Sequence, residues 1–377
     1  MAPLHAEFGW SRAEIAGAST CINLATILAA PFIGSLCDRI GVRRVALASL
    51  ISLTLGFLAL SAMNGSLLMY YTVWFLLSAG GVGTSGIVWT RAIGTYFERN
   101  RGLALGLTLT GTAFAALLAP LTLGPLIANV GWRSGFLALS GVSFLTIPIT
   151  YFFFRERLAD RSSNTVAGHI VKGVSLAQAV RQANFWKIGV GVFLLVLGMG
   201  SCLVHFVPMA VDTGVPLDVA RHLFAIIGLA MLFGRIAIGA LLDRFNPIHV
   251  SAVALAVPAL ACVLLLQEPF SPTVSAGVAA AIFGFSAGAE VDILAFLVAR
   301  YFGLRSYGAI YGCQLAFFAA GSGVGGVLTG HIRDVSGSYH PALMGGVVVF
   351  TLGALFILWL RPTSSNAASF DPAHAPL

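Results

Sequence analysis

The sequence carries little charge for its length. Asp, Glu, Lys and Arg together make up 9% of its 377 residues, whereas 58% of the residues are hydrophobic. An ordinary soluble domain has about 25% charged residues, so this composition excludes a water-soluble globular protein. Apolar runs of roughly 20 residues recur along the chain, and each is long enough to cross a hydrocarbon core about 30 Å thick. The short alternating segments of a transmembrane β-barrel are missing, so we expect an all-α protein with many membrane spans.

Other absences restrict the chemistry. The five cysteines form neither a CxxC motif nor a cluster with histidine, so we expect no metal site and no disulfide. No GxxxxGK[ST] phosphate loop occurs, which argues against ATP as the direct energy source. HExxH, GxSxG and paired catalytic residues are also missing, and we expect neither an enzyme nor a cofactor. The first residues do not resemble a cleavable signal peptide.

Eleven apolar segments have the length of membrane helices. They lie at about 13–36, 44–62, 67–93, 103–127, 134–154, 185–209, 219–241, 248–267, 273–299, 306–329 and 341–360. A polar stretch at about 155–184 separates the first five from the last six. These limits predict a first bundle at 1–154, a linker at 155–184, a second bundle at 185–361 and a tail at 362–377.

The basic residues are distributed unevenly between the two sides of the predicted bundle. Of the 21 lysines and arginines, fifteen fall on the side of the linker, four fall on the other side, and Arg91 and Arg235 lie within spans. Because basic loops stay in the cytoplasm, this asymmetry predicts a cytoplasmic linker and tail in the inner (plasma) membrane. The formal charge of +7 therefore reflects topology, and we expect a monomer with the lipid bilayer, not nucleic acid, as its partner.

Residues recur at an offset of 205 positions. The aligned pairs are Pro3 and Pro208, Gly9 and Gly214, Gly34 and Gly239, Asp38 and Asp243, Arg39 and Arg244, and Tyr96-Phe97 and Tyr301-Phe302; with one further residue of offset, Gly124 aligns with Gly330 and Gly131 with Gly337. Two parallel six-helix halves are a known transporter architecture, although glycines also align by chance. Segment 185–209 has no counterpart in the first half. Either the start site is set too late, which we favour, or the protein has eleven spans with its N-terminus outside.

Two short charged loops follow apolar helices, GSLCDRIGVRR at Gly34–Arg44 and GALLDRF at Gly239–Phe245. A carboxylate at such a helix end can pair with the arginines beside it. It can also face the N-terminus of a neighbouring helix, a contact that stabilises by about 0.3–1 kcal/mol. Contacts this weak can hold one conformation reversibly; alternatively, the arginines only hold the loops inside. The gating candidates are Asp38, Arg39, Gly41, Arg43, Asp243 and Arg244.

The pattern G-x-L-x-D-R-x-G-x-R-R resembles the loop signature of the major facilitator superfamily. The segments EFGWSRAEI, RGLALGL, GWRSGF and HFVPMAVDTG resemble its monocarboxylate and oxalate/formate porter group. The resemblance implies two pseudo-symmetric helical bundles, here without the family's first helix. It also implies alternating-access transport of a small organic anion with protons or a counter-anion. Efflux of other molecules, a channel and a non-transporting fragment are the alternatives; Leu77 replaces the arginine of drug antiporters, which disfavours drug efflux.

Three charged residues lie deep within predicted spans. Arg235 precedes Asp243 by eight residues, about 12 Å along a helix, and Asp292 lies at a similar depth. Glu290 lies about one step nearer the midplane and, being two residues away, is expected on a different face. A buried charge usually faces a cavity, and a guanidinium binds carboxylates bidentately. FGRIAIG resembles the segment that carries the substrate-binding arginine of the porters, but Met231 replaces their acidic residue. Asp292 or Glu290 can supply that charge; alternatively, Arg235 and Asp292 form a purely structural pair.

Further polar residues within the spans are candidates for substrate contacts. Arg91 lies near the inner end of its span, where it either binds substrate or reaches the lipid headgroups. His205 lies near the outer end and either passes protons or is simply solvated. The candidates for a hydrogen-bonding lining are Asn23, Tyr71, Tyr311 and Gln314. We expect Gly80, Gly81, Gly83, Gly321, Gly325 and Gly326 to allow close helix contact.

Overall fold

The computed structural model describes residues 2–97, 100–154, 159–160, 165–166, 169–170, 173–267 and 270–361. Almost all of these residues are helical. The first part contains α1 (Ala2–Phe8), α2 (Arg12–Ile40), α3 (Val42–Ser61), α4 (Leu67–Gly81), η1 (Val82–Thr84), α5 (Gly86–Tyr96), α6 (Arg101–Val130) and α7 (Trp132–Phe153). The second part contains α8 (Leu176–Val180), α9 (Ala183–Asp212), α10 (Leu217–Arg244), α11 (Pro247–Gln267), α12 (Pro272–Phe302), α13 (Tyr307–Ser336) and α14 (His340–Leu358).

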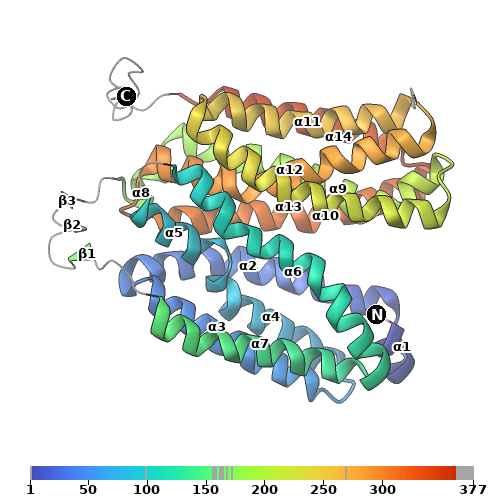
Figure 1. Cartoon of the computed structure of the whole chain (residues 1–377), viewed down its shortest axis with the longest axis horizontal. Helices are drawn as coiled ribbons and strands as arrows, with labels where there is room; N and C mark the ends of the chain where they lie inside the picture. Colours follow the sequence, from blue (N-terminus) through green and yellow to red (C-terminus); the bar gives the residue numbers. More distant parts are fainter. Residues whose placement is uncertain are drawn as a thin grey trace.

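The long helices run roughly along one axis (Figure 1). Helices α3, α4 and α7 lie on one side, α11 and α14 lie on the opposite side, and α2, α6, α12 and α13 lie between them. Among the described residues, ten helices are long and apolar enough to cross a membrane. The remaining predicted segment, 103–127, falls within α6, which is 30 residues long. The all-helical membrane fold predicted from composition is therefore confirmed.

The predicted linker at 155–184 is described only in part. Three two-residue strands, β1 (Ala159–Asp160), β2 (Thr165–Val166) and β3 (His169–Ile170), pair antiparallel in that order. The backbone N–H of Val174 then donates to the carbonyl oxygen of Phe302 at 2.9 Å, which holds the end of the linker against α12. The other predicted linker residues between 155 and 172 and the predicted tail at 362–377 lie outside the described residues.

One predicted span is interrupted, which corrects our expectation of a single helix over 67–93. Helix α4 ends at Gly81, η1 follows, and α5 begins at Gly86. Each glycine costs a helix about 0.8–1.0 kcal/mol relative to alanine, and GGVGTSG brings four of them together. The hydroxyls of Thr84 and Ser85 also donate to local carbonyl oxygens at 2.7 and 2.5 Å, so the backbone has an alternative to the regular helix.

The sequence repeat reappears as matched local structure. Gly9 and Gly214 have φ angles of 70° and 93°. Gly131 and its partner Gly337 have φ angles of 105° and 70° and end α6 and α13. A positive φ is unfavourable for residues with a Cβ, so glycine is required at the same turns of both halves.

The two halves meet along α2 with α13 and along α6 with α10. A Cβ added to Gly34 would overlap the backbone of Gly308, and a Cβ added to Gly239 would overlap that of Gly102. Small residues let helix backbones approach closely in a membrane. Gly34 and Gly239 are repeat partners at the offset of 205, and Gly102 and Gly308 are partners at an offset of 206. The same close helix crossing therefore occurs twice, with the two halves exchanged.

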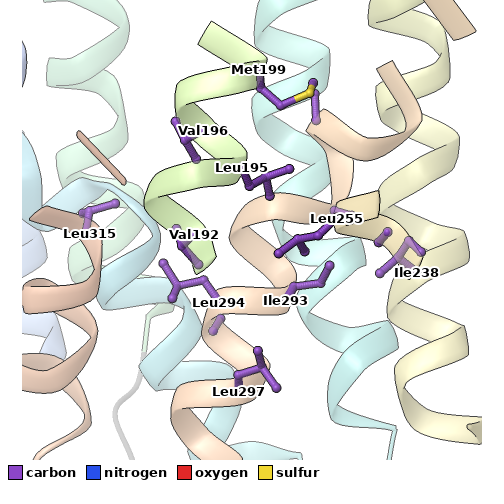
Figure 2. Packing of buried hydrophobic residues seen from close by; sticks show 14 of the residues in the cluster. Val192, Leu195, Val196, Met199, Ile238, Leu255, Ile293, Leu294, Leu297 and Leu315 are labelled. Atoms are coloured by element: carbon purple, nitrogen blue, oxygen red, sulfur yellow. The ribbon is translucent and has the colours of Figure 1, made fainter. Parts of the chain in front are cut away.

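The core of the second half surrounds α12 (Figure 2). Ile293, Leu294 and Leu297 of α12 pack with Val192 and Leu195 of α9. All five side chains are almost completely buried. This apolar packing fixes the position of α12, which also carries Glu290 and Asp292.

The two halves differ in how their matching helices are covered. Gly321 and Gly325 of α13 lie against the backbone of α9, which confirms their predicted role in close helix contact. At the corresponding places of α6, Ala115 is exposed and Ala119 is half-buried. Within the described residues, α1 matches only the end of α9 at the offset of 205, and no helix covers this face of α6 as the middle of α9 covers α13.

Candidate functional site

Asp38 joins the two halves at the end of the bundle where the linker begins. Its carboxylate oxygens accept hydrogen bonds from the backbone N–H groups of Gly308 and Ala309 at 3.0 and 2.9 Å. These groups belong to the first turn of α13, where a helix carries partial positive charge. The same carboxylate forms an ion pair with Arg91 of α5. The sequence predicted that Asp38 contacts either the arginines beside it or the N-terminus of a neighbouring helix. The structure shows the contact with a helix N-terminus.

Asp243 makes the matching contact in the opposite direction. Its carboxylate accepts hydrogen bonds from the backbone N–H groups of Gly102 and Leu103, both at 2.8 Å. These residues lie in the first turn of α6. Each aspartate thus comes from one half and caps a helix of the other half. We call these two contacts the crossed Asp caps.

The other gating candidates have different positions. Arg39 and Arg244 are exposed at the ends of α2 and α10. Gly41, with a φ of 97°, makes the turn between α2 and α3. Arg43 donates to the carbonyl oxygen of Tyr151 and lies 4.8 Å from its ring centre. Arg43 therefore ties α3 to α7 within the first half and does not take part in the crossed Asp caps.

A seam of hydroxyl and aromatic groups joins α5 to α13. The hydroxyl of Tyr307 donates to the Thr90 hydroxyl at 2.9 Å. The Tyr307 ring stacks on Tyr311 with 5.6 Å between ring centres. The hydroxyl of Tyr311 reaches the helix break, because a Cβ added to Gly86 would lie 2.5 Å from that oxygen. The seam links the cap at Asp38 to the interior of the bundle.

A charged cluster lies between α10 and α12. Arg235 Nη1 is 3.3 Å from Asp292 Oδ1, and the two residues are only 6% and 0% exposed. Glycines bring the helices together here: a Cβ on Gly288 would lie 3.0 Å from the backbone nitrogen of Arg235. Glu290, 7% exposed, interacts electrostatically with Arg235. The structure thus brings together the three buried charges singled out from the sequence.

Several polar atoms of this cluster are buried and have no hydrogen-bond partner in the part of the chain that the structure describes. They are Arg235 Nε, Asp292 Oδ2, Glu290 Oε1 and the hydroxyl of Tyr311, which interacts electrostatically with both Arg235 and Asp292. Native proteins leave few such atoms unpaired, because each costs about 1–3 kcal/mol and more when the group is charged. The cluster therefore has unused capacity to bind a ligand.

The charge of the cluster has no counterpart in the first half. At an offset of 205, Arg235 corresponds to Ala30, Asp292 to Ile87 and Glu290 to Ser85. The backbone geometry is nevertheless repeated: a Cβ on Gly312 would meet Ala30, and a Cβ on Gly106 would meet the backbone of Arg235. The helix packing is thus repeated in both halves, whereas this set of ionisable groups occurs in the second half and not at the matching positions of the first.

The remaining substrate-binding candidates lie outside the cluster. Arg91 pairs with Asp38 in a crossed Asp cap, so it neither joins Arg235 nor extends to lipid. Tyr71 donates to the carbonyl oxygen of Glu14 at 2.8 Å and ties α4 to α2. Gln314 is buried and donates to the carbonyl oxygen of Phe185 at 3.0 Å, tying α13 to α9. Asn23 donates to the carbonyl oxygen of Ser19 and lies beside Gly323.

His205 is fixed within the second half, which corrects the alternative of a simply solvated side chain. Its Nε2 lies 2.9 Å from the carbonyl oxygen of Gly326, and its Nδ1 lies 3.2 Å from the hydroxyl of Tyr339. A neutral imidazole protonated on Nε2 satisfies both contacts, donating to the carbonyl and accepting from the hydroxyl. His205 thus connects α9 to α13 and to the beginning of α14.

The sequence reasoning missed two matched clusters at the other end of the bundle. In the first half, Glu7 pairs with Arg133 at 2.7 Å, and the guanidinium lies 4.3 Å from the ring centre of Trp132. In the second half, Asp212 pairs with Arg333 at 3.1 Å, and Arg333 lies 5.3 Å from the ring of Tyr339. Glu7 and Asp212 are 205 positions apart, a signal that could have revealed them. Each cluster stays within its half.

Acid is expected to weaken the first of these clusters. The hydrogen bond from Trp132, followed by that from Arg133, lowers the pKa of Glu7 below its ordinary value of 4.5. A lowered pKa stabilises the fold above the ordinary value, and this contribution is lost as the pH falls through the lowered pKa. Glu7→Gln should therefore lower the thermal unfolding midpoint at pH 7 but not at an acidic pH below the lowered pKa of Glu7. A midpoint difference that is the same at both pH values would contradict this account.

Comparison with known proteins identifies the family. The model of the Major Facilitator Superfamily matches residues 1–325. The MFS transporter asaE of Aspergillus flavus is 27% identical over 340 residues, covering 88% of this chain and 74% of that protein. Monocarboxylate transporter 13 of Bos taurus is 27% identical over 347 residues, covering 89% and 79%. The crystal structure of the E. coli fucose:proton symporter FucP superposes with a TM-score of 0.75 at 14% identity, covering 96% and 94% of the two chains.

The fold and the sequence thus agree. Two helical halves, crossed Asp caps at repeated loops, and a family model that spans most of the residues all point the same way, and the relatives are transporters and not enzymes. The resemblance inferred from the loop motifs is confirmed. The chain is a multi-pass membrane protein that belongs to the Major Facilitator Superfamily.

Proposed function

We propose that this protein is a secondary transporter of a small organic anion of the monocarboxylate type. The observation that carries the proposal is the buried Arg235 cluster, whose guanidinium, carboxylate and hydroxyl groups retain unpaired polar atoms. An uncompensated polar group is expensive in a membrane protein, so a permanent cluster of this kind indicates a ligand that comes and goes. The name of the bovine relative, a monocarboxylate transporter, supports the same class of substrate.

Arg235 is the anion-binding group in this proposal. One of its terminal nitrogens contacts Asp292, while Nε has no hydrogen-bond partner within the described ranges. A guanidinium offers five donors in a planar fork that fits a carboxylate, so a substrate carboxylate can bind beside Asp292 or replace it. The hydroxyl of Tyr311 is a further donor from α13. Because these groups are enclosed by α10, α12 and α13, they suit a small anion.

The crossed Asp caps supply the conformational part of the mechanism. They hold the halves together at the end of the bundle that we place in the cytoplasm, and each consists of a few polar contacts that can break and re-form. Rocking of the halves about the Arg235 cluster then exposes the anion to either side of the inner (plasma) membrane in turn. Protons or a counter-anion provide the driving force.

Efflux of an uncharged molecule is the second candidate, and one observation favours it. A groove of about 440 Å³ is lined by Leu203, Val204 and Val207 of α9 and Phe224 of α10. The lining is apolar and does not include Arg235, so an anion would not bind there. Phe224→Ala should reduce the transport of an apolar cargo and leave anion transport unchanged.

Counterflow in proteoliposomes tests the main proposal. Vesicles loaded with unlabelled formate, lactate or pyruvate should take up the same labelled anion through the wild-type protein. Arg235→Lys keeps the charge beside Asp292 but removes the planar fork. The loss of about one charge-assisted hydrogen bond, worth about 1.5–3 kcal/mol, should raise the half-saturation concentration about 10- to 100-fold.

Arg221→Lys is the matched control, since Arg221 lies on the same helix but is exposed and, among the described residues, forms an ion pair with Asp218 alone. Its counterflow should equal that of the wild type. Counterflow that is unchanged in Arg235→Lys would rule out Arg235 as the anion-binding group. Flux that never saturates would instead indicate a channel.

A further inference from the structure

The Arg235 cluster contains more acidic than basic groups. Two carboxylates, Glu290 and Asp292, share one guanidinium, and all three residues are at least nine-tenths buried. Only Asp292 is hydrogen-bonded to Arg235. Glu290 Oε1 and Asp292 Oδ2 have no hydrogen-bond partner among the described residues. With both carboxylates ionised, the cluster would carry a net negative charge.

Among the described residues, the surrounding helices add no second cation that acts on these carboxylates. Helix α10 contributes Arg235, which acts on both, and α13 contributes Tyr311, which acts on Asp292. The arginines at 91 and 101 act on Tyr307, one turn further along α13. Where α6 and α5 approach, they present Gly106 and Gly86.

The remaining neighbours of α12 are apolar at this level. Val192 and Leu195 of α9 and Leu255 of α11 lie near Ile293 and Leu294 (Figure 2). The effective penalty for an unpaired buried ion is several kcal/mol, and a carboxylate avoids it by taking up a proton. Charge balance therefore requires a proton in the empty cluster.

We propose that Glu290 and Asp292 form the proton-coupling site, which holds one proton when empty and takes up a second proton with each anion. This inference rests on the proposed function, because it assumes that the anion binds Arg235. In the empty site, Asp292 stays ionised against Arg235 and the proton resides on Glu290, the carboxylate that lacks the ion pair. The site then has no net charge.

Binding of the anion changes this balance by one unit. When the substrate carboxylate occupies Arg235, the Asp292–Arg235 ion pair breaks and Asp292 becomes the surplus base. An O–H bond forms on Asp292 with a proton from the solution to which the site is open, and the loaded site is again neutral. Release of the anion re-forms the ion pair and returns this proton to the other side. The proposed mode is thus symport of one proton with one anion.

This charge balance predicts that the two carboxylates can replace each other in proton coupling. Either carboxylate alone can balance Arg235 when the site is empty and take up the proton when it is loaded. Glu290→Gln and Asp292→Asn should each therefore retain proton coupling. Only the double variant, Glu290→Gln/Asp292→Asn, has no group left to carry the proton, so it should move the anion without one.

Infrared spectroscopy tests the proton of the empty site without any substrate. Purified wild-type protein at neutral pH should show the carbonyl band of a protonated carboxylic acid, and Glu290→Gln should lose that band. Glu14→Gln is the control, since Glu14 is only half-buried and its carboxylate accepts hydrogen bonds from Ser11. Identical spectra for the wild type and Glu290→Gln would overturn the assignment.

Transport tests the second proton, with labelled formate, lactate and pyruvate as probes. An inward acid gradient should drive accumulation about tenfold per pH unit for symport of one proton, in the wild type and in both single variants. The double variant should not accumulate the anion, even at the rate of counterflow that it retains. Accumulation by the double variant, loss of coupling in Glu290→Gln, or accumulation driven by a sodium gradient would each overturn the inference.

These outcomes are separable from failure of the proposed function. If no probe shows counterflow in the wild type, the anion proposal fails, whereas the infrared result still decides whether Glu290 holds a proton. If the double variant does not fold, the two single variants and the infrared band decide the inference.

Discussion

Asp38→Asn is expected to open the end of the bundle that carries the crossed Asp caps. Asparagine can accept only one of the two backbone hydrogen bonds from Gly308 and Ala309, and its NH₂ group faces the other donor. It also leaves the guanidinium of Arg91, whose side chain is 15% exposed, without its ionic partner. Each charge-assisted hydrogen bond is worth about 1.5–3 kcal/mol. We therefore expect the closed arrangement to lose about 2–4 kcal/mol, a shift of about 30- to 1,000-fold in its population.

Spin labels report this shift directly. Arg44 and Arg305 are exposed near the two sides of the Asp38 cap, and cysteines placed there for labelling should show a longer distance in Asp38→Asn than in the wild-type background. Transport should fall as well, because a carrier that rarely closes on this side completes few cycles. Asp218→Asn is the control: Asp218 is exposed and forms only a surface pair with Arg221, and such pairs contribute about 0–1 kcal/mol.

The matching residue provides a graded comparison. Asp243 accepts two backbone hydrogen bonds from α6, and the described contacts give it no ion pair comparable to that with Arg91. Asp243→Asn should therefore shift the distance distribution in the same direction but by less. Equal distances in the wild type and both variants would show that the crossed Asp caps do not hold the halves together.

The fold could be predicted from the sequence because each membrane helix requires a long run of apolar residues. Each predicted segment corresponds to one helix of the structure except 67–93, which is divided between α4, η1 and α5. The glycine and aspartate repeats marked the contacts that occur twice. The break at Val82–Ser85 was missed since hydropathy records only that the segment is apolar. Local hydrogen bonds of Thr84 and Ser85 decide the backbone there, and they become visible only in three dimensions.

The candidate site could be predicted less completely than the fold, because helix orientation as well as hydropathy decides which residues meet. A charge in an apolar run is conspicuous, so Arg235, Asp292 and Glu290 could be found from the sequence alone. The helix face on which a polar residue lies depends on how helices are rotated against their neighbours, which hydropathy does not record. Arg91 therefore proved to contact Asp38, and Tyr71 proved to join α4 to α2.

Arg235→Met should produce the largest loss of stability in the molecule. It removes the one guanidinium that acts on Asp292 and Glu290, and breaking a buried pair in this way costs about 3–5 kcal/mol. Unfolding by SDS in mixed micelles, compared with the wild type, measures the loss. Arg333→Met is the matched control, because the Arg333 and Asp212 side chains are 33% and 37% exposed, and a partly exposed pair should cost about 1 kcal/mol or less.

The double variant Arg235→Met/Asp292→Leu separates a structural pair from a functional one. Replacing a buried ion pair by apolar side chains of similar volume is often neutral or stabilising, so the double variant should recover most of the stability that Arg235→Met loses. If the pair existed only to neutralise two buried charges, this variant would also transport. We expect it to fold and to show no counterflow, because a methionine cannot bind a carboxylate. A stable double variant that still exchanges labelled formate, lactate or pyruvate would place the anion site elsewhere in the bundle.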